Sequence, residues 1–261
     1  MLIDLAINAF GADVPDMLEA ASLAEETGYA CLWVTDHFSG AVVGRDWTRD
    51  PFVCLGAMAA VTERIELGVL VANVVNRHPA QLASAVNSLQ SFAPGRIRLG
   101  VGSGAAPGSR FAVEHEAIGR SLGTAGERRR VLIDSIGALR AIWRGDEAFD
   151  APEVGFDGLR GVVDGARRPP IVVGASAWET VEVALAHADG VNLRVTGSLD
   201  GHLTRLRAER PAGFEVSVLD GMVAPRADRS ALSTGGCDRL ILGISTPFDR
   251  STILGSGPDT P

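Results

Sequence analysis

The sequence predicts one α/β domain over residues 1–261, folded as a closed (β/α)8 TIM barrel of eight parallel strands. Three observations lead to this fold class. Short β-branched apolar runs alternate with amphipathic helical segments, an order typical of parallel sheets. The length of 261 residues is close to the roughly 250 residues of one such barrel. Eight strand-like runs can be assigned, and this number favours closure over an open doubly wound sheet.

The first half of the chain carries four of the strand-like runs. Gly28 follows the first helical pattern, where a left-handed residue commonly ends a helix, and Asp13 precedes it as a candidate cap. Asp50 and Pro51 form an N-cap and a first-turn proline, and Pro79 begins a third helix. Strands are expected at residues 2–8, 31–35, 65–71 and 97–101, and helices at 15–27, from 51 onward and at 79–92.

The second half of the chain carries the other four runs. Thr124 and Glu127 have the spacing of a capping box, so a helix is expected to begin there. Ser176 and Glu179 repeat this spacing ahead of a helix that Gly190 ends. Strands are expected at residues 171–173, 190–193, 214–219 and 239–244.

Three segments lack a clear period. Residues 103–123 are glycine-rich and follow the fourth strand, and they are expected to form an extended rim loop, since loops of this length are usually functional. Residues 146–169 are irregular. Residues 246–261 form a tail without clear structure, which implies a shortened C-terminus with no eighth helix. Other segments or a partner subunit would then cover that side of the barrel.

The composition excludes several classes of function. The net charge of −8 argues against nucleic acid or an anionic membrane as partner, and no run of about 18 apolar residues indicates a membrane span. All 24 basic residues are arginine, which excludes Schiff-base chemistry on lysine. Cys31, Cys54 and Cys237 lack C-x-x-C spacing, so a reduced cytoplasmic protein is expected. A small-molecule substrate is the partner class that remains.

Small and polar residues collect at the carboxyl ends of the strands, which form the active face of a (β/α)8 barrel. Asp36 and His37 follow the second strand, and Asn192 and Arg194 end the sixth. Their convergence on one rim predicts a binding site. The same rim receives Ser103 and Gly104 after the fourth strand, Gly174–Ser176 after the fifth and Ser245 after the eighth.

Asp36 and His37 are the pair expected to carry chemistry. A histidine titrates near neutrality and can exchange a proton or hydrogen-bond a ring heteroatom. The adjacent carboxylate can orient a polar ligand edge or favour the imidazolium. The alternative is structural, in which Asp36 caps a local turn and His37 is a rim residue with satisfied hydrogen bonds.

Two turns rich in small residues are candidates for holding a cofactor. Gly174–Glu179 lies at a helix N-terminus, where backbone N–H groups and the dipole attract phosphate; a capping box without ligand is the alternative. Gly100–Gly104 lacks the Rossmann spacing and fits backbone beneath a planar ring, or a glycine turn without ligand. His115 in the rim loop is expected either to reach a substrate or to be solvated. No H-x-x-H or H-E-x-x-H spacing occurs, so no metal is expected.

From about Leu2 to Ser245 the chain resembles the luciferase-like flavin and deazaflavin oxidoreductases. The motifs that carry the resemblance follow the family's order along the chain, and together they are specific. They are GYACLWVTDHF (28–38), TERIELGVLVANVVNRHPAQLA (62–83), GRIRLGVGSG (95–104), PPIVVGAS (169–176) with HADGVN (187–192), and DRLILGI (238–244).

The resemblance implies a cofactor ring over the carboxyl rim of a parallel barrel, and a homodimer. It implies catalytic roles for Asp36, at the ring, and for His37 in proton transfer. It also implies a non-proline cis peptide in a bulge of the third strand, which motif alignment puts at Val69–Leu70. The cofactor-binding residues that it implies are Asp36, Val69, Leu70, Ala72, Ser103, Gly104, Gly174, Ala175, Ser176 and Ala177.

The sequence Thr35-Asp36-His37 resembles the deazaflavin branch, since flavin monooxygenases of the family tend to carry Glu-His-His there. The resemblance therefore implies coenzyme F-420 and hydride transfer to or from a small organic substrate. FMN, used with oxygen by a monooxygenase, is the alternative. Ala105 stands where the family's sugar-phosphate dehydrogenases carry a glutamate, which argues against glucose 6-phosphate. Together with the short segments, Ala105 leaves a third possibility, a barrel that binds cofactor or ligand without turnover.

Overall fold

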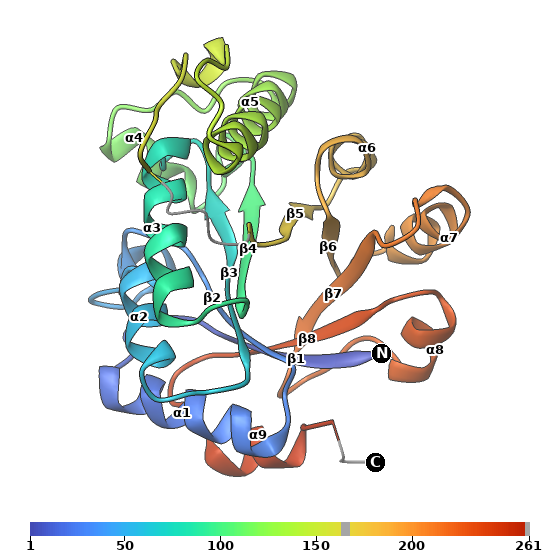
Figure 1. Ribbon diagram of the computed structural model, residues 1–261. Helices are drawn as coiled ribbons and strands as arrows, with labels where there is room; N and C mark the ends of the chain where they lie inside the picture. The colour runs from blue at the N-terminus through green and yellow to red at the C-terminus, as the bar shows by residue number, and fades with distance from the viewer. Residues whose placement is uncertain (163–167, 259–261) are drawn as a thin grey trace.

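The computed structural model describes residues 1–162 and 168–258 and shows a closed barrel (Figure 1). Its strands are all parallel, and each pairs with its neighbours in chain order until β8 meets β1. The predicted (β/α)8 fold class is therefore confirmed. The strands are β1 (Leu2–Ile7), β2 (Cys31–Val34), β3 (Glu66–Asn73), β4 (Ile97–Gly102), β5 (Ile171–Ala175), β6 (Gly190–Arg194), β7 (Glu215–Gly221) and β8 (Arg239–Ile244).

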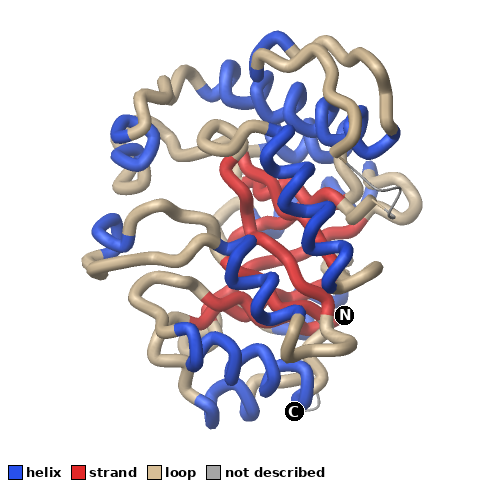
Figure 2. The backbone as a smooth tube through the Cα atoms, turned by 60° about the vertical axis from the view of Figure 1, so that its left-hand side comes forward, coloured by secondary structure: helices blue, strands red, loops and turns tan. Residues whose placement is uncertain are grey.

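Helices surround the strands on the outside of the barrel (Figure 2). Most of them connect one strand to the next, as the alternating sequence pattern predicts. They are α1 (Val14–Thr27), α2 (Pro51–Ala59), α3 (Pro79–Phe92), α4 (Ala112–Ala117), α5 (Ala125–Arg144), α6 (Trp178–His187), α7 (Leu199–Glu209), α8 (Arg229–Thr234) and α9 (Arg250–Gly255), with short 3-10 turns η1 (Gly40–Val43) and η2 (Pro152–Val154).

The two predicted capping boxes have different outcomes. The Thr124 side chain accepts from the Glu127 N–H while the Glu127 carboxylate accepts from the Thr124 N–H, so the first is confirmed. The second, of Ser176 and Glu179, is wrong. The N-cap of α6 is Ala177, and no side chain caps the helix, because β5 runs on to residue 175 and leaves Ser176 one position too early. The first turn of α6 therefore keeps its backbone N–H groups for another partner.

Two segments without a sequence period contain helices. α4 lies within the rim loop of residues 103–123, and α9 lies within residues 246–261, so the prediction of an unstructured tail is wrong. Asp249 caps α9, and Tyr29 Oη donates to the Ile253 carbonyl at 2.8 Å, which fastens α9 beside α1. Helices of six residues carry too few apolar positions for a pattern to reveal. The described residues exclude 163–167, within the irregular 146–169 segment, and 259–261 of the tail.

β3 contains the expected irregularity one residue later than predicted. Its pairing with β4 shifts between Val69 and Ala72, and the non-proline cis peptide joins Leu70 to Val71. The predicted position at Val69–Leu70 is therefore wrong. Every side chain in this run is apolar, so none marks which face it belongs to. Since successive strand residues point to opposite faces, such a run cannot reveal where one extra residue sits.

A small apolar cluster fills the middle of the barrel interior. Trp33 is its largest member and is fully buried. A Cβ on Gly68 of the neighbouring strand would lie 2.5 Å from the Trp33 ring, so the glycine makes room for the indole. Above this level, Leu70 and Leu219 form the floor of the rim cavities described below. The cluster consists of Ala6, Cys31, Trp33, Leu70 and Ile241, with Val71 and Leu219 packed against it.

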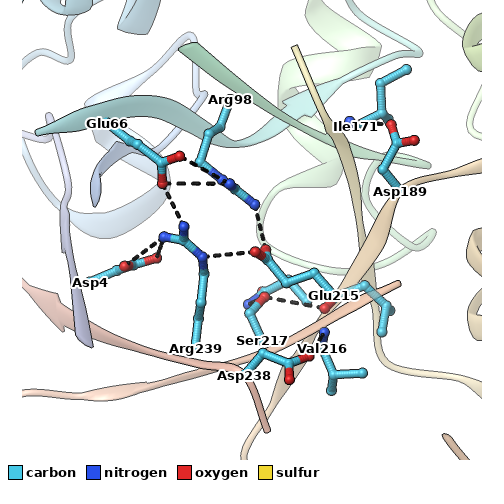
Figure 3. Close-up of polar contacts among 12 residues, drawn as sticks. Asp4, Glu66, Arg98, Ile171, Asp189, Glu215, Val216, Ser217, Asp238 and Arg239 are labelled. Carbon is cyan, nitrogen blue, oxygen red and sulfur yellow. Dashed lines mark hydrogen bonds and ion pairs between the residues drawn. The ribbon is translucent and has the colours of Figure 1, made fainter. Parts of the chain in front are cut away.

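A group of buried and half-buried charges, here the basal charge cluster, closes the amino-terminal end of the barrel (Figure 3). The guanidinium of Arg239 donates to Asp4 at 3.0 and 3.1 Å and to Glu66 at 2.6 Å. Its Nε donates to Glu215 at 2.8 Å. Arg98 joins the two glutamates, at 3.3 Å to Glu66 and 2.5 Å to Glu215. The cluster thus ties β1, β3, β4, β7 and β8 together where these strands begin.

The basal charge cluster holds three carboxylates and two guanidinium groups. Asp4 is its most buried member, with no exposed side-chain surface, and also accepts from Trp33 Nε1 at 2.9 Å. Burial raises the pKa of Asp4 to about 6, against the opposing effect of Arg239. Protonation of Asp4 leaves two negative charges against two positive ones, so the neutral acid balances the cluster.

Replacing Asp4 by asparagine should make the free energy of unfolding less dependent on pH. The folded-state pKa of Asp4 lies above the ordinary 3.8. Asp4 therefore stabilises the folded protein below pH 4, and this contribution to the free energy of unfolding is lost as the pH rises through 6. Between pH 4.5 and pH 7.5, urea unfolding should therefore show the free energy of unfolding of the variant rising relative to wild type by about 2 kcal/mol, because roughly 1.5 pH units separate pH 4.5 from the folded-state pKa at 1.36 kcal/mol each.

Asp13→Asn is the control for the Asp4 variant, because Asp13 is exposed and its side chain caps nothing. It should follow the wild-type pH dependence. A difference between wild type and Asp4→Asn that stays constant from pH 4.5 to 7.5 would contradict the charge imbalance.

Cys31, Cys54 and Cys237 are buried free thiols, and burial raises the pKa of each above its ordinary value. Thiolate is the reactive form of cysteine, so these side chains act as apolar packing groups. Within residues 1–162 and 168–258, no helix is both long and apolar enough to cross a membrane.

Candidate active site

The carboxyl ends of the strands surround a cavity of about 520 Å³, here the main cavity. This volume lies within the roughly 300–1,000 Å³ of small-molecule sites. A second space of about 280 Å³, the side cavity, adjoins it over β1, β7 and β8. The two cavities share Thr35, Leu70, Arg194 and Leu219.

Most of the residues predicted to bind a cofactor come together around the main cavity. Val69 and Ala72 do not, because both are buried in the core between the strands and the helices. The one-residue displacement of the bulge explains this, since Val71 and Asn73 line the cavity in their place. The predicted residues that line it are Asp36, His37, Leu70, Ser103, Gly104, Gly174, Ala175, Ser176 and Ala177.

His37 stands at the edge of the main cavity with its ring held on several sides. Phe111 stacks on the imidazole with centroids 4.6 Å apart, and Phe10 lies 4.9 Å away. Nδ1 is 2.9 Å from Glu114 Oε2. Among the described residues Nε2 has no hydrogen-bond partner, so it is the ring nitrogen left for a ligand.

Glu114 projects from α4 and fixes the orientation of His37. Its side chain is only 3% exposed, and Oε1 accepts from the N–H groups of Phe38 at 2.7 Å and Ser39 at 2.9 Å. Burial alone would raise the pKa of Glu114, but the hydrogen bonds from His37, Ser39 and Phe38 hold it below its ordinary value. An ionised carboxylate only accepts hydrogen bonds. The proton of a neutral His37 therefore resides on Nδ1, and its lone pair on Nε2.

Asp36 pairs with Arg77 and not with the imidazole of His37. Its carboxylate accepts from Arg77 Nε and Nη2, both at 2.8 Å, and from the Asn73 N–H at 3.1 Å. Arg77 also donates to Asp50 at 2.7 Å. The carboxylate that pairs with the imidazole is thus Glu114, while Asp36 joins the turn after β2 to the turn after β3.

His115 neither lines the main cavity nor reaches solvent, contrary to both expectations. It is fully buried, and its Nε2 accepts from the Ala105 N–H at 3.2 Å and lies 3.0 Å from Asn73 Nδ2. Burial lowers the pKa of His115, so the ring is neutral at physiological pH. Sequence reasoning singled out His115 and passed over Glu114, because a short helix in a glycine-rich loop gives no sign of which side chain faces inward.

The glycines of the rim have a packing reason as well as a place at the cavity. A Cβ on Gly102 would lie 2.6 Å from Val71 Cγ2, and one on Gly174 would lie 3.0 Å from Val71 Cγ1. These glycines therefore make room for the bulge of β3. Both also line the main cavity, so the same small residues widen it.

Three arginines give the main cavity a positive wall in a chain of net charge −8. Arg128 donates to the carbonyls of Leu122 and Gly123. Arg129 and Arg194 have no acidic partner among the described residues. Arg129 faces the cavity from α5, and the uncapped start of α6 at Ala177 also lines it. An anionic group bound there could therefore accept from both backbone N–H groups and a guanidinium. In residues 1–162 and 168–258, no three His, Cys, Asp or Glu side chains are grouped so as to hold a metal.

Comparison with known proteins places this site in context. The sequence profile of the family described as luciferase-like monooxygenase matches residues 4–210. A 5,10-methylenetetrahydromethanopterin reductase of Methanolobus tindarius is 29% identical over 200 residues, 76% of this chain and 52% of that protein. An F-420-dependent hydroxymycolic acid dehydrogenase of Mycobacterium tuberculosis is 30% identical over 172 residues, 65% of this chain and 46% of that protein. The chain spans about half the length of these curated relatives.

Solved structures show the same fold. An F-420-dependent secondary alcohol dehydrogenase in complex with an F-420-acetone adduct superposes with a TM-score of 0.77 at 15% identity over 97% of both chains. The F-420-dependent tetrahydromethanopterin reductase from Methanopyrus kandleri gives a TM-score of 0.76 at 14% identity, over 100% of this chain and 99% of that one. At such identities the likeness concerns the fold alone.

Proposed function

The chain belongs to the luciferase-like monooxygenase family, and from this premise we propose that it is an oxidoreductase that uses coenzyme F-420 to move a hydride to or from a small organic substrate. The observation that carries the proposal is the His37–Glu114 pair, which presents one free imidazole nitrogen at the edge of a cavity of cofactor size.

The residues around the main cavity fit such a cofactor. Its floor is apolar and formed by Leu70 and Val71, which suits a flat ring system. The small residues from Gly174 to Ala177 and the guanidinium of Arg129 suit the phosphate group that F-420 and FMN both carry. We therefore assign the ring to the β3–β4 side of the cavity and the phosphate to the β5–α6 turn.

In this assignment the chain's own residues supply positioning and proton transfer. When bound, the deazaflavin supplies a carbon that accepts or donates a hydride. His37 Nε2 takes the proton that an alcohol loses as its carbon is oxidised, or returns it in the reverse direction. Glu114 holds the imidazole in the tautomer that leaves Nε2 free. Phe10 and Phe111 pack against the imidazole and help to fix its position.

Two further observations favour F-420 over FMN. The motif Thr35-Asp36-His37 resembles that of deazaflavin enzymes, and the curated relatives include proteins named F-420-dependent. FMN with monooxygenase chemistry and a barrel that binds without turnover are the alternatives. A homodimer in the cytoplasm completes the proposal, and light scattering of the purified protein tests the dimer.

A fluorescence titration of the purified protein should show saturable binding of F-420 and much weaker binding of FMN. Arg129→Ala should weaken F-420 binding about tenfold, because a charge-assisted hydrogen bond contributes about 1.5–3 kcal/mol. The matched control is Arg130→Ala, since Arg130 is exposed on the same helix and pairs with Glu153 outside the cavity. Arg130→Ala should bind as wild type does.

Tight FMN binding without F-420 binding would overturn the cofactor assignment and leave the monooxygenase. If Arg129→Ala and Arg130→Ala weaken F-420 binding equally, the assignment of the phosphate group to Arg129 is wrong. If any member of a substrate panel is turned over with the cofactor, the alternative of a barrel that binds without turnover is excluded.

A further inference from the structure

The side cavity is lined by several polar and charged side chains. It lies over the ends of β1, β6, β7 and β8, next to the main cavity. Its volume of about 280 Å³ is below the roughly 300–1,000 Å³ of drug-sized sites. An occupant of the side cavity must therefore be a small molecule.

Ser245 provides a free hydrogen-bond donor in this cavity. Asn8 Nδ2 donates to Ser245 Oγ at 2.7 Å, so the Ser245 hydroxyl hydrogen remains free to donate elsewhere. Ser245 is exposed and lines the cavity, so an oxygen of a ligand can accept this hydrogen. Asn8 Oδ1 has no partner among the described residues, but it has less than 1 Å² of accessible surface and is closed to a ligand.

Arg194 and Arg226 provide positive charge in the same cavity. The nearby Asp220 does not neutralise both, because its oxygens accept from the backbone N–H groups of Gly221, Arg226 and Ala227 at 2.7–2.9 Å. Arg226 Nε lies 3.6 Å from Asp220, and Arg194 has no acidic partner in the part of the chain that the structure describes. The cavity therefore keeps a surplus positive charge in an acidic chain.

We propose that the side cavity is the substrate site, and that it takes a small hydroxycarboxylate or the corresponding oxo acid. The carboxylate pairs with Arg194 and Arg226, and the hydroxyl or oxo oxygen of the substrate accepts a hydrogen bond from Ser245 Oγ. The inference rests on the proposed function in one respect. Because the cavities share Thr35 and Leu70, a carbon bound here borders the space assigned to F-420.

In the proposed reaction, F-420 exchanges the hydride with the substrate and His37 Nε2 exchanges the proton. In oxidation, the C–H hydrogen of the hydroxyl-bearing carbon leaves with its electron pair to oxidised F-420. The hydroxyl proton passes to Nε2 of His37, which lines the adjoining main cavity, and the carbon–oxygen single bond becomes the carbonyl of the oxo acid. Reduction of the oxo acid runs through the same steps in reverse.

Binding of four probes to the cofactor-free protein tests the site without any turnover. Ligand-observed NMR titrations would use L-lactate, propionate, propan-2-ol and inorganic phosphate. L-lactate should bind saturably. Propionate, which lacks the hydroxyl, and propan-2-ol, which lacks the carboxylate, should each bind at least fivefold more weakly. In the Arg129→Ala protein, which lacks the phosphate contact proposed for the main cavity, inorganic phosphate should bind no better than propionate.

Three variants locate the contacts. Arg226→Met should weaken L-lactate about tenfold or more, as loss of a charge-assisted hydrogen bond implies. Ser245→Ala should abolish the preference for L-lactate over propionate. Arg64→Met is the control, because it removes the same charge from an exposed loop before β3, at the opposite end of the barrel, and should bind L-lactate as wild type does.

Equal L-lactate affinity in wild type and Arg226→Met would overturn the site, as would equal affinity for L-lactate and propan-2-ol. In the Arg129→Ala protein, phosphate binding as tightly as L-lactate would overturn the substrate class and leave a general anion site. The F-420 titration separates this inference from the proposed function, because Arg226 lines only the side cavity. If the wild-type protein binds F-420 but not L-lactate, the substrate site is wrong and the cofactor assignment stands. If it binds L-lactate but not F-420, the cofactor assignment is wrong and the substrate site stands.

Discussion

His37→Gln is expected to lower kcat by roughly 100- to 10,000-fold, the usual contribution of general acid–base catalysis, and to leave F-420 affinity nearly unchanged. Glutamine retains hydrogen-bonding capacity at the cavity edge but has no titratable nitrogen. The ring pocket of Phe10 and Phe111 would otherwise stay in place. Steady-state kinetics with the substrate found in the panel, together with the F-420 titration, measure both quantities.

Glu114→Gln tests the positioning role separately. The amide oxygen can still accept from the Phe38 and Ser39 N–H groups, so the turn after β2 should persist. The amide no longer presents a carboxylate to His37 Nδ1, and the imidazole loses its fixed tautomer. We expect a fall in kcat smaller than that of His37→Gln, an unchanged KM and an altered pH–rate profile.

His202→Gln is the control for these variants, since His202 lies on α7 beside Trp178, away from both cavities. Its kinetics should match wild type. A His37→Gln protein with wild-type kcat would show that proton transfer occurs elsewhere, and a Glu114→Gln protein with an unchanged pH profile would show that the carboxylate has only a packing role.

Arg239→Met should lower the free energy of unfolding by about 3–5 kcal/mol, the cost of removing one partner from a buried ion pair. Methionine matches the stem of arginine but leaves Asp4, Glu66 and Glu215 with Arg98 as their single cation in the basal charge cluster. This loss is a large share of the roughly 5–15 kcal/mol that stabilises a typical domain. Urea unfolding followed by far-UV circular dichroism measures it.

Two comparisons isolate the charge from the packing. Arg250→Met removes an exposed arginine paired with Glu19 and should cost no more than about 1 kcal/mol. Combining Arg239→Met with Asp4→Asn should recover part of the loss, because one unpaired carboxylate is then neutral. If Arg239→Met costs no more than Arg250→Met, the basal charge cluster contributes little to stability.

The barrel could be predicted because its signal is repeated along the chain. Each strand is a short apolar run followed by a turn and an amphipathic helix, so an error in one element leaves the others intact. α9 could not be found this way, since its six residues are held by Asp249 and Tyr29 rather than by a long apolar stripe. The false capping box at Ser176 arose because spacing alone does not tell where β5 ends.

The site was predictable only as far as it follows strand ends. His37 and the Gly174–Ala177 turn come directly after β2 and β5, so topology brings them to one rim. Glu114 lies 77 residues from His37 in the chain, and only the folded path of the rim loop brings them together. The error at Val69 and Ala72 has a similar origin, because a bulge changes which side chains face inward without changing composition.

The contact between α4 and His37 has a consequence for any effort to redesign this protein. Segments like residues 105–123 are natural choices for exchange between homologues, because they frame the opening through which molecules enter. In this chain such a graft would also discard Glu114, and with it the carboxylate that orients the imidazole. An engineered chimaera must therefore either retain an acid at that point of the transplanted segment or provide one from another element.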